Sequence, residues 1–220
     1  RGLGDVYKRQ ERGITIFSDQ AAFSYDGDAY TLVDTPGHVD FSAEMERSLK
    51  VLDYAVLVLS AVEGIQGHTL TLWKLLRQAG VPAALLINKM DRTGAEPDRV
   101  LEDIRRRLTT DAVDFTGAEP GDWPETLREA MAERDEALLE TYLSGAAEEG
   151  DYLRTARRLM AERRLFPVFC GSALNQTGIQ TFWAWFHRLT VTGYQEKEGA
   201  PFGGFVYKIR NEGGCRTAYI

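Results

Sequence analysis

Cysteine and histidine are both scarce in this chain of 220 residues, which has two cysteines and three histidines. Two cysteines are too few for the disulfide framework of a small secreted protein, and neither Cys170 nor Cys215 has metal-ligand spacing. The histidines are widely separated, which gives no support to a metal-site enzyme or a nucleophilic triad. We therefore expect a reducing environment and a cytoplasmic location.

Long apolar runs are also absent. The longest, such as residues 54–61, have the length of a strand, so the sequence contains no candidate membrane span, and it shows no signal peptide. The formal net charge of −7 argues against a protein that coats nucleic acid regardless of sequence, because such a protein needs a basic face. It does not exclude docking on a large ribonucleoprotein through a local patch. We expect neither a membrane nor DNA as a partner.

The ends of the chain indicate a fragment of a longer protein. The sequence does not begin with methionine, and it stops at residue 220 inside a strand-like pattern. Residues 1–10 show neither helical nor strand periodicity, so we expect them to be non-native and set them aside. We expect one domain over residues 11–195 and, after a polar linker, the first strands of a separate β-domain over residues 200–220.

The larger domain has the alternating pattern of an α/β fold. Apolar runs at residues 54–60, 81–87 and 165–170 predict strands of a parallel sheet, each followed by a helix. Pro167 would be awkward in a central strand, so we expect the third run at an edge. Asp-Gly between two apolar runs predicts a β-hairpin within residues 14–35.

Two further stretches predict packing rather than binding. Amphipathic segments at about 123–143 and 151–163 predict a helical insertion, over about 109–164, that packs on the flank of the domain. The later helix carries an aromatic stripe, which helical spacing assigns to the core rather than to a ligand site. The stripe comprises the aromatic residues Phe182, Trp183, Trp185 and Phe186 together with Ile179.

The stretch Asp34-Thr-Pro-Gly-His38 follows an apolar strand and precedes an amphipathic helix that starts near Phe41. Ligands of open α/β sheets bind at the carboxyl ends of the strands. A carboxylate there suits a magnesium ion, and the Gly37 amide suits a phosphate oxygen. By itself the pentapeptide can also be an ordinary strand-ending turn, since Pro and Gly are common in turns.

Two more strands end in polar loops, Asn88-Lys-Met-Asp91 and Gly171-Ser-Ala173. The Asp91 carboxylate can accept hydrogen bonds from the ring N1–H and the exocyclic amine of guanine, which adenine does not offer together. Asn88 can hold the loop and reach N7, and the aliphatic stem of Lys89 can lie along the base. Ser172 and Ala173 can offer backbone N–H groups to the guanine oxygen.

With Arg12-Gly-Ile-Thr-Ile16 upstream, this set of motifs resembles the translational GTPases, from Glu11 to Ile220. Within that superfamily the chain is similar to elongation factor G and to the tetracycline ribosomal-protection proteins. The short insertion and the Arg216–Ile220 stretch resemble the second group more. The resemblance implies a three-layer α/β GTP-binding domain of the P-loop NTPase type with a helical insertion, followed by the start of a β-barrel domain.

The resemblance also implies roles for single residues. Thr15 would coordinate Mg²⁺ and contact the γ-phosphate of GTP, and Asp34 would hold the Mg²⁺ through water. The Gly37 amide would sense the γ-phosphate. His38 would orient the attacking water once ribosomal RNA lies beside it. Asn88, Lys89, Asp91, Ser172 and Ala173 would bind the guanine of GTP or GDP. His68 and His187 have no such context, and we interpret them as a solvated loop residue and a helix-surface residue.

The function implied is GTP hydrolysis that drives a conformational cycle on the ribosome, by a monomeric factor most similar to the ribosomal-protection proteins. Elongation factor G proper, which drives translocation, is one alternative. A guanine-nucleotide-binding module that does not hydrolyse GTP is another, although the presence of both Thr15 and His38 argues against it.

One part of the family's site is missing from the sequence. No Gly-x-x-x-x-Gly-Lys-Ser/Thr phosphate loop occurs in it, and the family places that loop upstream of Arg12. We therefore expect this polypeptide to bind GTP poorly or not at all and to be inactive by itself, and its full-length parent to bind GTP well.

Overall fold

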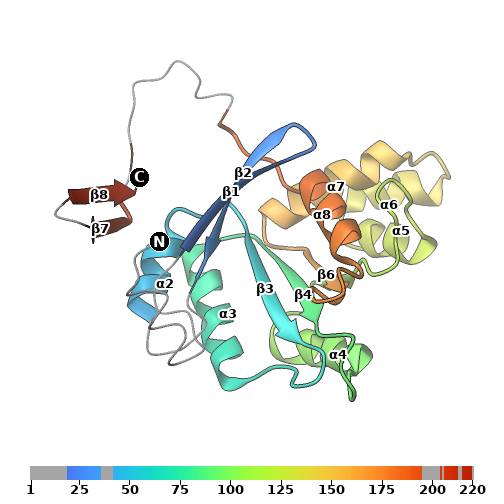
Figure 1. The fold of residues 1–220 in the computed structure, drawn as a ribbon. Helices are drawn as coiled ribbons and strands as arrows, with labels where there is room; N and C mark the ends of the chain where they lie inside the picture. The colour runs from blue at the N-terminus through green and yellow to red at the C-terminus, as the bar shows by residue number, and fades with distance from the viewer. Residues whose placement is uncertain (1–18, 36–41, 195–203, 205, 213–214, 220) are drawn as a thin grey trace. The chain divides into compact units, whose positions relative to one another are not determined.

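A computed structural model describes residues 19–35, 42–194, 204, 206–212 and 215–219 (Figure 1). The chain divides into two compact units. One comprises Asp53–Thr192, and the other comprises the described residues before and after that range. No helix in the described part of the chain is long and apolar enough to cross a membrane.

The 53–192 unit is built on a four-stranded parallel sheet with the order β3-β4-β6-β5. Its strands are β3 (Ala55–Ser60), β4 (Ala83–Asn88), β5 (Ala112–Asp114) and β6 (Phe166–Cys170). Residues 83–87 of β4 are all buried, as expected for a strand covered on both faces. Because the strands are parallel, their carboxyl ends lie along one edge.

Helices cover both faces of this sheet, so the predicted three-layer α/β arrangement is confirmed (Figure 1). Leu85 and Ile87 pack with residues of α3 (Gly67–Ala79) and α4 (Pro97–Arg107), while Ala84 and Leu86 pack with the helices of the other face. This alternation follows from the two-residue period of a strand. The α3 helix ends at Gly80 with φ 71, in the left-handed conformation that glycine adopts without strain.

The other face carries α8 (Ile179–Leu189) and three further helices, α5 (Glu125–Ala132), α6 (Glu136–Leu143) and α7 (Glu149–Ala161). The predicted segment 123–143 is therefore two helices. Asp135 separates them, because its side chain accepts a hydrogen bond from the Leu138 N–H at 2.8 Å and so caps α6. The strand β5 also lies within the range expected to be a helical insertion. The domain limits proposed from the sequence stay a prediction.

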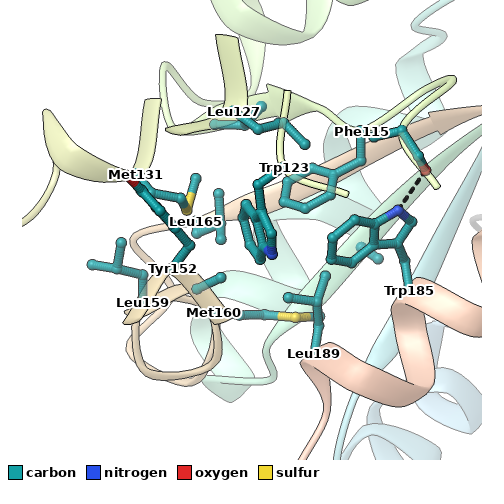
Figure 2. Packing of buried hydrophobic residues seen from close by; sticks show 14 of the residues in the cluster. Phe115, Trp123, Leu127, Met131, Tyr152, Leu159, Met160, Leu165, Trp185 and Leu189 are labelled. Carbon is teal, nitrogen blue, oxygen red and sulfur yellow. Dashed lines mark hydrogen bonds between the residues drawn. The ribbon is translucent and has the colours of Figure 1, made fainter. Parts of the chain in front are cut away.

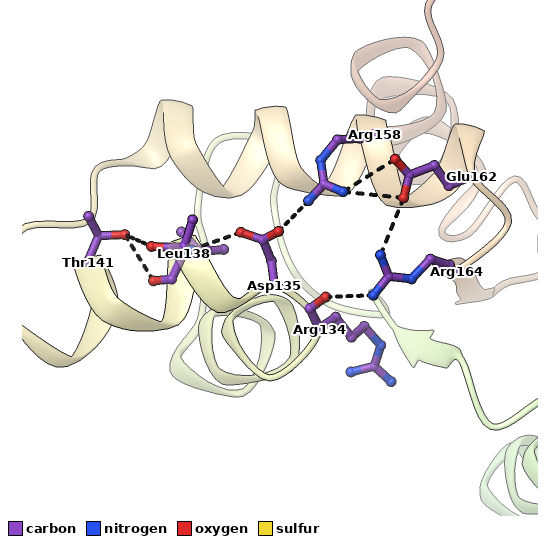
Figure 3. Close-up of polar contacts among 8 residues, drawn as sticks. Arg134, Asp135, Leu138, Thr141, Arg158, Glu162 and Arg164 are labelled. Atoms are coloured by element: carbon purple, nitrogen blue, oxygen red, sulfur yellow. Dashed lines mark hydrogen bonds and ion pairs between the residues drawn. The ribbon is translucent and has the colours of Figure 1, made fainter.

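Polar contacts hold these helices to one another (Figure 3). Arg158 of α7 contacts Asp135 at 2.5 Å and Glu162 at 3.2 Å. Arg164, which precedes β6, contacts Glu162 at 3.4 Å and donates to the Arg134 carbonyl at 3.1 Å. The network therefore links the α5–α6 junction to α7 and to the chain that enters the sheet.

The aromatic stripe of α8 packs in the core, as predicted. Phe182, Trp185 and Phe186 are buried, and Ile179 and Trp183 pack against the same cluster. Figure 2 shows the Trp185 ring beside Phe115 and Trp123, with its indole N–H donating to a backbone carbonyl. That acceptor is the carbonyl of Ala118, at 2.7 Å.

The predicted edge position of Pro167 is wrong, because β6 lies between β4 and β5. The hydrogen bonds show which neighbouring strand the proline nitrogen faces. The Phe166 N–H donates to the Asp111 carbonyl on the β5 side, so by alternation the Pro167 nitrogen faces β4. The β4–β6 ladder starts only at Val168, directly after the residue that has no N–H to donate.

The second unit contains the predicted hairpin, formed by β1 (Asp19–Tyr25) and β2 (Asp28–Asp34). Its turn residues, Asp26 and Gly27, both have positive φ, at 48° and 88°, as a two-residue turn of this kind requires. The unit also contains α2 (Ser42–Leu49). The strand pattern near the end of the chain is confirmed by the antiparallel strands β7 (Lys208–Glu212) and β8 (Cys215–Tyr219).

Candidate functional site

The loops that follow β4 and β6 are in direct contact. Ile87 and Cys170 are paired in neighbouring parallel strands, so both loops start at the same height on the sheet edge. The Asn88 side-chain oxygen accepts a hydrogen bond from the Ala173 N–H at 2.9 Å. The Met90 N–H donates to the Gly171 carbonyl at 3.2 Å. Two stretches separated by about eighty residues thus form one surface.

A second contact joins two side chains of these loops. The Ser172 hydroxyl donates to the Asp91 carboxylate at 2.5 Å, and Ser172 itself is buried. This hydrogen bond lowers the pKa of the Asp91 carboxyl below its ordinary value, because it stabilises the charged form. The Asp91 side chain keeps 16% of its surface exposed, so an ionised acceptor remains accessible to a ligand.

The loop after β6 is closed on itself and is therefore well defined. The Ser172 N–H donates to the Thr177 carbonyl at 2.9 Å, and the Thr177 N–H donates back to the Ser172 carbonyl at 3.1 Å. Two glycines make this closure possible. A Cβ atom on Gly171 would lie 2.7 Å from the Thr177 carbonyl oxygen, and one on Gly178 would lie 2.6 Å from the Cys170 carbonyl oxygen.

This closure changes what the loop can offer to a ligand. We expected the Ser172 and Ala173 amides both to be available, but the Ser172 N–H is used within the loop and the Ala173 N–H is held by Asn88. The next residue, Leu174, lies outside the motifs found in the sequence. No acceptor for its N–H lies among the described residues, and it is 74% exposed. Its signal in the sequence is an apolar residue directly after Ser-Ala in a polar loop.

Lys89 lies beside this surface in an unusual backbone conformation, with φ 68. A residue with a Cβ atom adopts this region only when its surroundings hold it there. Its side-chain nitrogen lies 3.5 Å from the carboxylate of Glu63, in the loop between β3 and α3. The sequence reasoning assigned no role to Glu63.

The remaining predicted site residues belong to the other unit or lie outside the described residues. Asp34 is the last residue of β2 and is exposed. Thr15, Gly37 and His38 fall outside the described ranges. His68 lies in the first turn of α3, and not in a loop as expected, while His187 is half-buried on α8.

In the part of the chain that the structure describes, acidic, histidine and cysteine side chains do not converge on a protein-enclosed metal site. Within the described ranges, no group of three or more His, Cys, Asp or Glu side chains could hold a metal ion. A magnesium site does not need such a cage. Mg²⁺ keeps several waters and takes phosphate oxygens as ligands, so one or two carboxylates of the kind that Asp34 carries are enough on the protein side.

The chain is similar to known proteins over most of its length. Residues 2–191 match the family described as the elongation factor Tu GTP binding domain. The oxytetracycline resistance protein of Streptomyces rimosus is 37% identical over 96% of this chain and 34% of that protein. The tetracycline resistance protein TetW of Butyrivibrio fibrisolvens is 34% identical over 98% of this chain and 35% of that protein.

Two further similarities are more limited. One covers a smaller part of the chain, and the other concerns the fold alone. Elongation factor G of Rhodopirellula baltica is 48% identical over 51% of this chain and 17% of that protein. A crystal structure from Thermus thermophilus superposes with a TM-score of 0.79 over 96% of this chain and 38% of that one. At 22% identity, that structure supports the fold alone.

The chain spans about a third of the length of the two resistance proteins that it matches. The family match nevertheless covers most of the chain, and it includes the β4 and β6 loops whose contact is described above. The chain therefore belongs to the elongation factor Tu GTP-binding domain family of translational GTPases, in the branch that contains the tetracycline resistance proteins and elongation factor G.

Proposed function

We propose that this chain is the guanine-nucleotide-binding part of a ribosome-acting GTPase similar to the tetracycline ribosomal-protection proteins. The observation that carries the proposal is the hydrogen bond between Ser172 and Asp91, which brings the two base-reading loops together around an ionised acceptor. The parent protein hydrolyses GTP in the cytoplasm as a monomer, and hydrolysis drives its conformational cycle on the ribosome.

Guanine recognition follows from the donors and acceptors of these loops. The Asp91 carboxylate accepts from the base N1–H and the exocyclic amine. Adenine has no N1–H, so it would leave this charged acceptor without its partners, which costs affinity. The base oxygen takes the Leu174 N–H, and it takes the Ala173 N–H once the Asn88 side chain turns away. Asn88 is then able to use its amide nitrogen on N7.

Apolar groups are available for the two faces of the base. The aliphatic stem of Lys89 covers one face, and the exposed side chain of Leu174 covers the other. Both residues flank Asp91 and Ala173, so the hydrogen-bonding edge of the base and its faces are contacted by the same two loops.

The phosphate end of the site is assigned from the sequence motifs. Asp34 and Thr15 would hold Mg²⁺, which neutralises phosphate charge when it is bound. The Gly37 amide would contact the γ-phosphate, and His38 would orient the attacking water beside ribosomal RNA. Phosphoryl transfer depends mainly on positioning and on charge stabilisation, so these roles require no covalent intermediate.

The two candidate parent functions differ in their support from the relatives. Resistance proteins match almost the whole chain at 34–37% identity, whereas elongation factor G of Rhodopirellula baltica matches half of it at 48%. The wider coverage favours a ribosomal-protection function over translocation. Rescue of tetracycline-inhibited translation by the full-length parent would support the first, and replacement of elongation factor G in a translocation assay would support the second.

Ribosome-stimulated release of phosphate from GTP tests the catalytic proposal. We expect the His38→Ala variant of the full-length parent to lose about 100-fold or more of this rate, in line with the loss of one positioned catalytic group. The matched control is His68→Ala, which removes an exposed histidine from α3. Equal rates for His38→Ala and the unmodified protein would exclude His38 from the mechanism. Tight nucleotide binding without phosphate release would favour the non-hydrolysing module.

A further inference from the structure

Glu63 lies outside all the motifs that point to nucleotide binding, yet its carboxylate faces one of their residues. Its Oε2 atom is 3.5 Å from the Nζ atom of Lys89. The Glu63 side chain is 60% exposed and that of Lys89 is 51% exposed. A single exposed ion pair contributes little to the stability of a fold. The main effect of this pair is therefore expected on the position of the Lys89 side chain.

The backbone around Glu63 is held by several contacts. The Ser60 hydroxyl accepts the Glu63 N–H at 3.2 Å, and the Gln66 side chain donates to the Glu63 carbonyl at 2.8 Å. The next residue, Gly64, has φ 65 and donates to the Ser60 carbonyl at 2.8 Å. From α4, Arg99 donates to the Val62 carbonyl at 3.1 Å. The carboxylate thus projects from a loop with a well-defined conformation.

The backbone of Lys89 is equally constrained. It adopts φ 68 between the end of β4 and Met90, whose N–H donates to the Gly171 carbonyl. Only the long side chain of Lys89 still rotates freely. Fixing it over a bound base costs conformational entropy. An ion pair to a carboxylate on a neighbouring, constrained loop reduces the number of directions that this side chain samples.

We propose that Glu63 is a positioning residue for the guanine site, which holds the Lys89 ammonium so that the lysine stem is already in place to cover the base. This inference rests on the proposed guanine-nucleotide binding at Asp91 and Ser172. The loop between β3 and α3 then contributes to base binding indirectly, through Lys89. The expected consequence is tighter binding through preorganisation.

The test measures the affinity of the full-length parent for fluorescent GDP in Glu63→Gln, which keeps the shape and removes the charge. At low salt we expect a Kd about 2- to 5-fold higher than in the unmodified protein, the range typical of an exposed ion pair. At about 1 M salt we expect the two values to converge, because exposed charges are screened. Glu140→Gln removes the same charge from an exposed position of α6 and should leave the Kd unchanged at both salt concentrations.

A double-mutant cycle shows whether the effect passes through Lys89. Lys89→Met keeps an unbranched apolar stem and removes the ammonium, so in that background Glu63→Gln should change the Kd no further. An unchanged Kd in Glu63→Gln alone, or an equal effect in the Lys89→Met background, would overturn the positioning role while leaving guanine binding intact. Failure of the unmodified parent to bind GDP would overturn the proposed function itself, together with this inference.

Discussion

The Ser172 hydroxyl and the Asp91 carboxylate, 81 positions apart in the sequence, are joined by a hydrogen bond of 2.5 Å. Ser172 is buried and also accepts the Asn175 N–H at 3.2 Å, so its hydroxyl is oriented by the loop that carries it. The hydroxyl proton is therefore directed at the carboxylate. This arrangement keeps Asp91 both ionised and oriented, which are the two properties needed to accept hydrogen bonds from guanine.

Loss of this hydroxyl should change the pH dependence of nucleotide binding. The Ser172 hydrogen bond lowers the pKa of Asp91, so the favourable interaction with guanine is present at neutral pH and disappears as the pH falls through that lowered pKa. In Ser172→Ala the pKa rises toward its ordinary value, and the affinity should begin to fall at a higher pH. Titration of fluorescent GDP between pH 7 and about pH 4 measures this difference.

Ser144→Ala is the matched control for that titration. Ser144 follows α6, and its hydroxyl donates to the Thr141 carbonyl, away from the β4 and β6 loops. We expect its pH profile to coincide with that of the unmodified protein. Coincident profiles for Ser172→Ala and the unmodified protein would contradict the role of the hydroxyl in keeping Asp91 ionised.

Asp91→Asn should change which base is preferred. The amide offers one acceptor and one donor where the carboxylate offers two acceptors, so guanine loses a partner for one of its two donors. Xanthine carries a carbonyl oxygen in place of the exocyclic amine and can accept from the new amide. We expect GDP affinity to fall about 100-fold or more and affinity for xanthosine diphosphate to rise. Competition between the two nucleotides measures the change; a variant that still prefers GDP would argue against Asp91 as the base-reading group.

Gly178→Ala should disturb the loop that carries Ser172 and Ala173. Gly178 has φ 74, and an added Cβ would lie 2.6 Å from the backbone oxygen of Cys170. The left-handed conformation costs about 1–2 kcal/mol, and the overlap adds to this cost. We expect lower thermal stability and about a 10-fold or greater loss of GDP affinity, because the loop must shift. Fluorescent GDP titration and thermal unfolding measure the two effects.

Gly94→Ala separates backbone strain from overlap. Gly94 has φ 84, but no atom lies within 4 Å of an added Cβ, so this variant carries only the conformational cost. We expect about 1–2 kcal/mol of destabilisation and little change in GDP affinity. If both glycine variants lose the same affinity, the close approach at Gly178 does not control the loop.

Trp185→Phe should destabilise the core more than Trp123→Phe. Both rings are buried in one cluster, but the Trp185 N–H donates to the Ala118 carbonyl at 2.7 Å, whereas the buried Trp123 N–H has no hydrogen-bond partner among the described residues (Figure 2). The two substitutions remove the same atoms, and only the first leaves a carbonyl unpaired. We expect a difference of about 1–3 kcal/mol in unfolding free energy, measured by denaturant titration. Equal losses would mean that water replaces the lost donor.

Local patterns in the sequence were sufficient for several parts of the fold. The hairpin turn at Asp26-Gly27 was predictable because two consecutive residues with positive φ require such a pair. The helix end at Gly80 follows from the same conformational preference. The burial of Trp185 follows from the spacing of apolar residues along one helix face.

Features that depend on neighbouring strands or on side-chain rotation were not predictable in this way. Pro167 was expected at an edge because proline lacks an N–H, but β6 pairs with strands on both sides and its ladder with β4 starts at the residue after the proline. The Ser172 amide was expected to face a ligand, but the chain closes back on Thr177 and uses it. The Glu63–Lys89 ion pair joins two loops whose proximity no motif encodes.

The sequence by itself determined the alternation of buried strands and helices, the polar loops at the strand ends and the hydrogen-bonding chemistry that their residues offer, because these follow from residue type and local periodicity. The tertiary structure decided which of these groups lie together and which are already engaged. It placed Asp91 against Ser172, Asn88 against Ala173 and Lys89 against Glu63, since strand register and loop closure, which are long-range properties, set those distances.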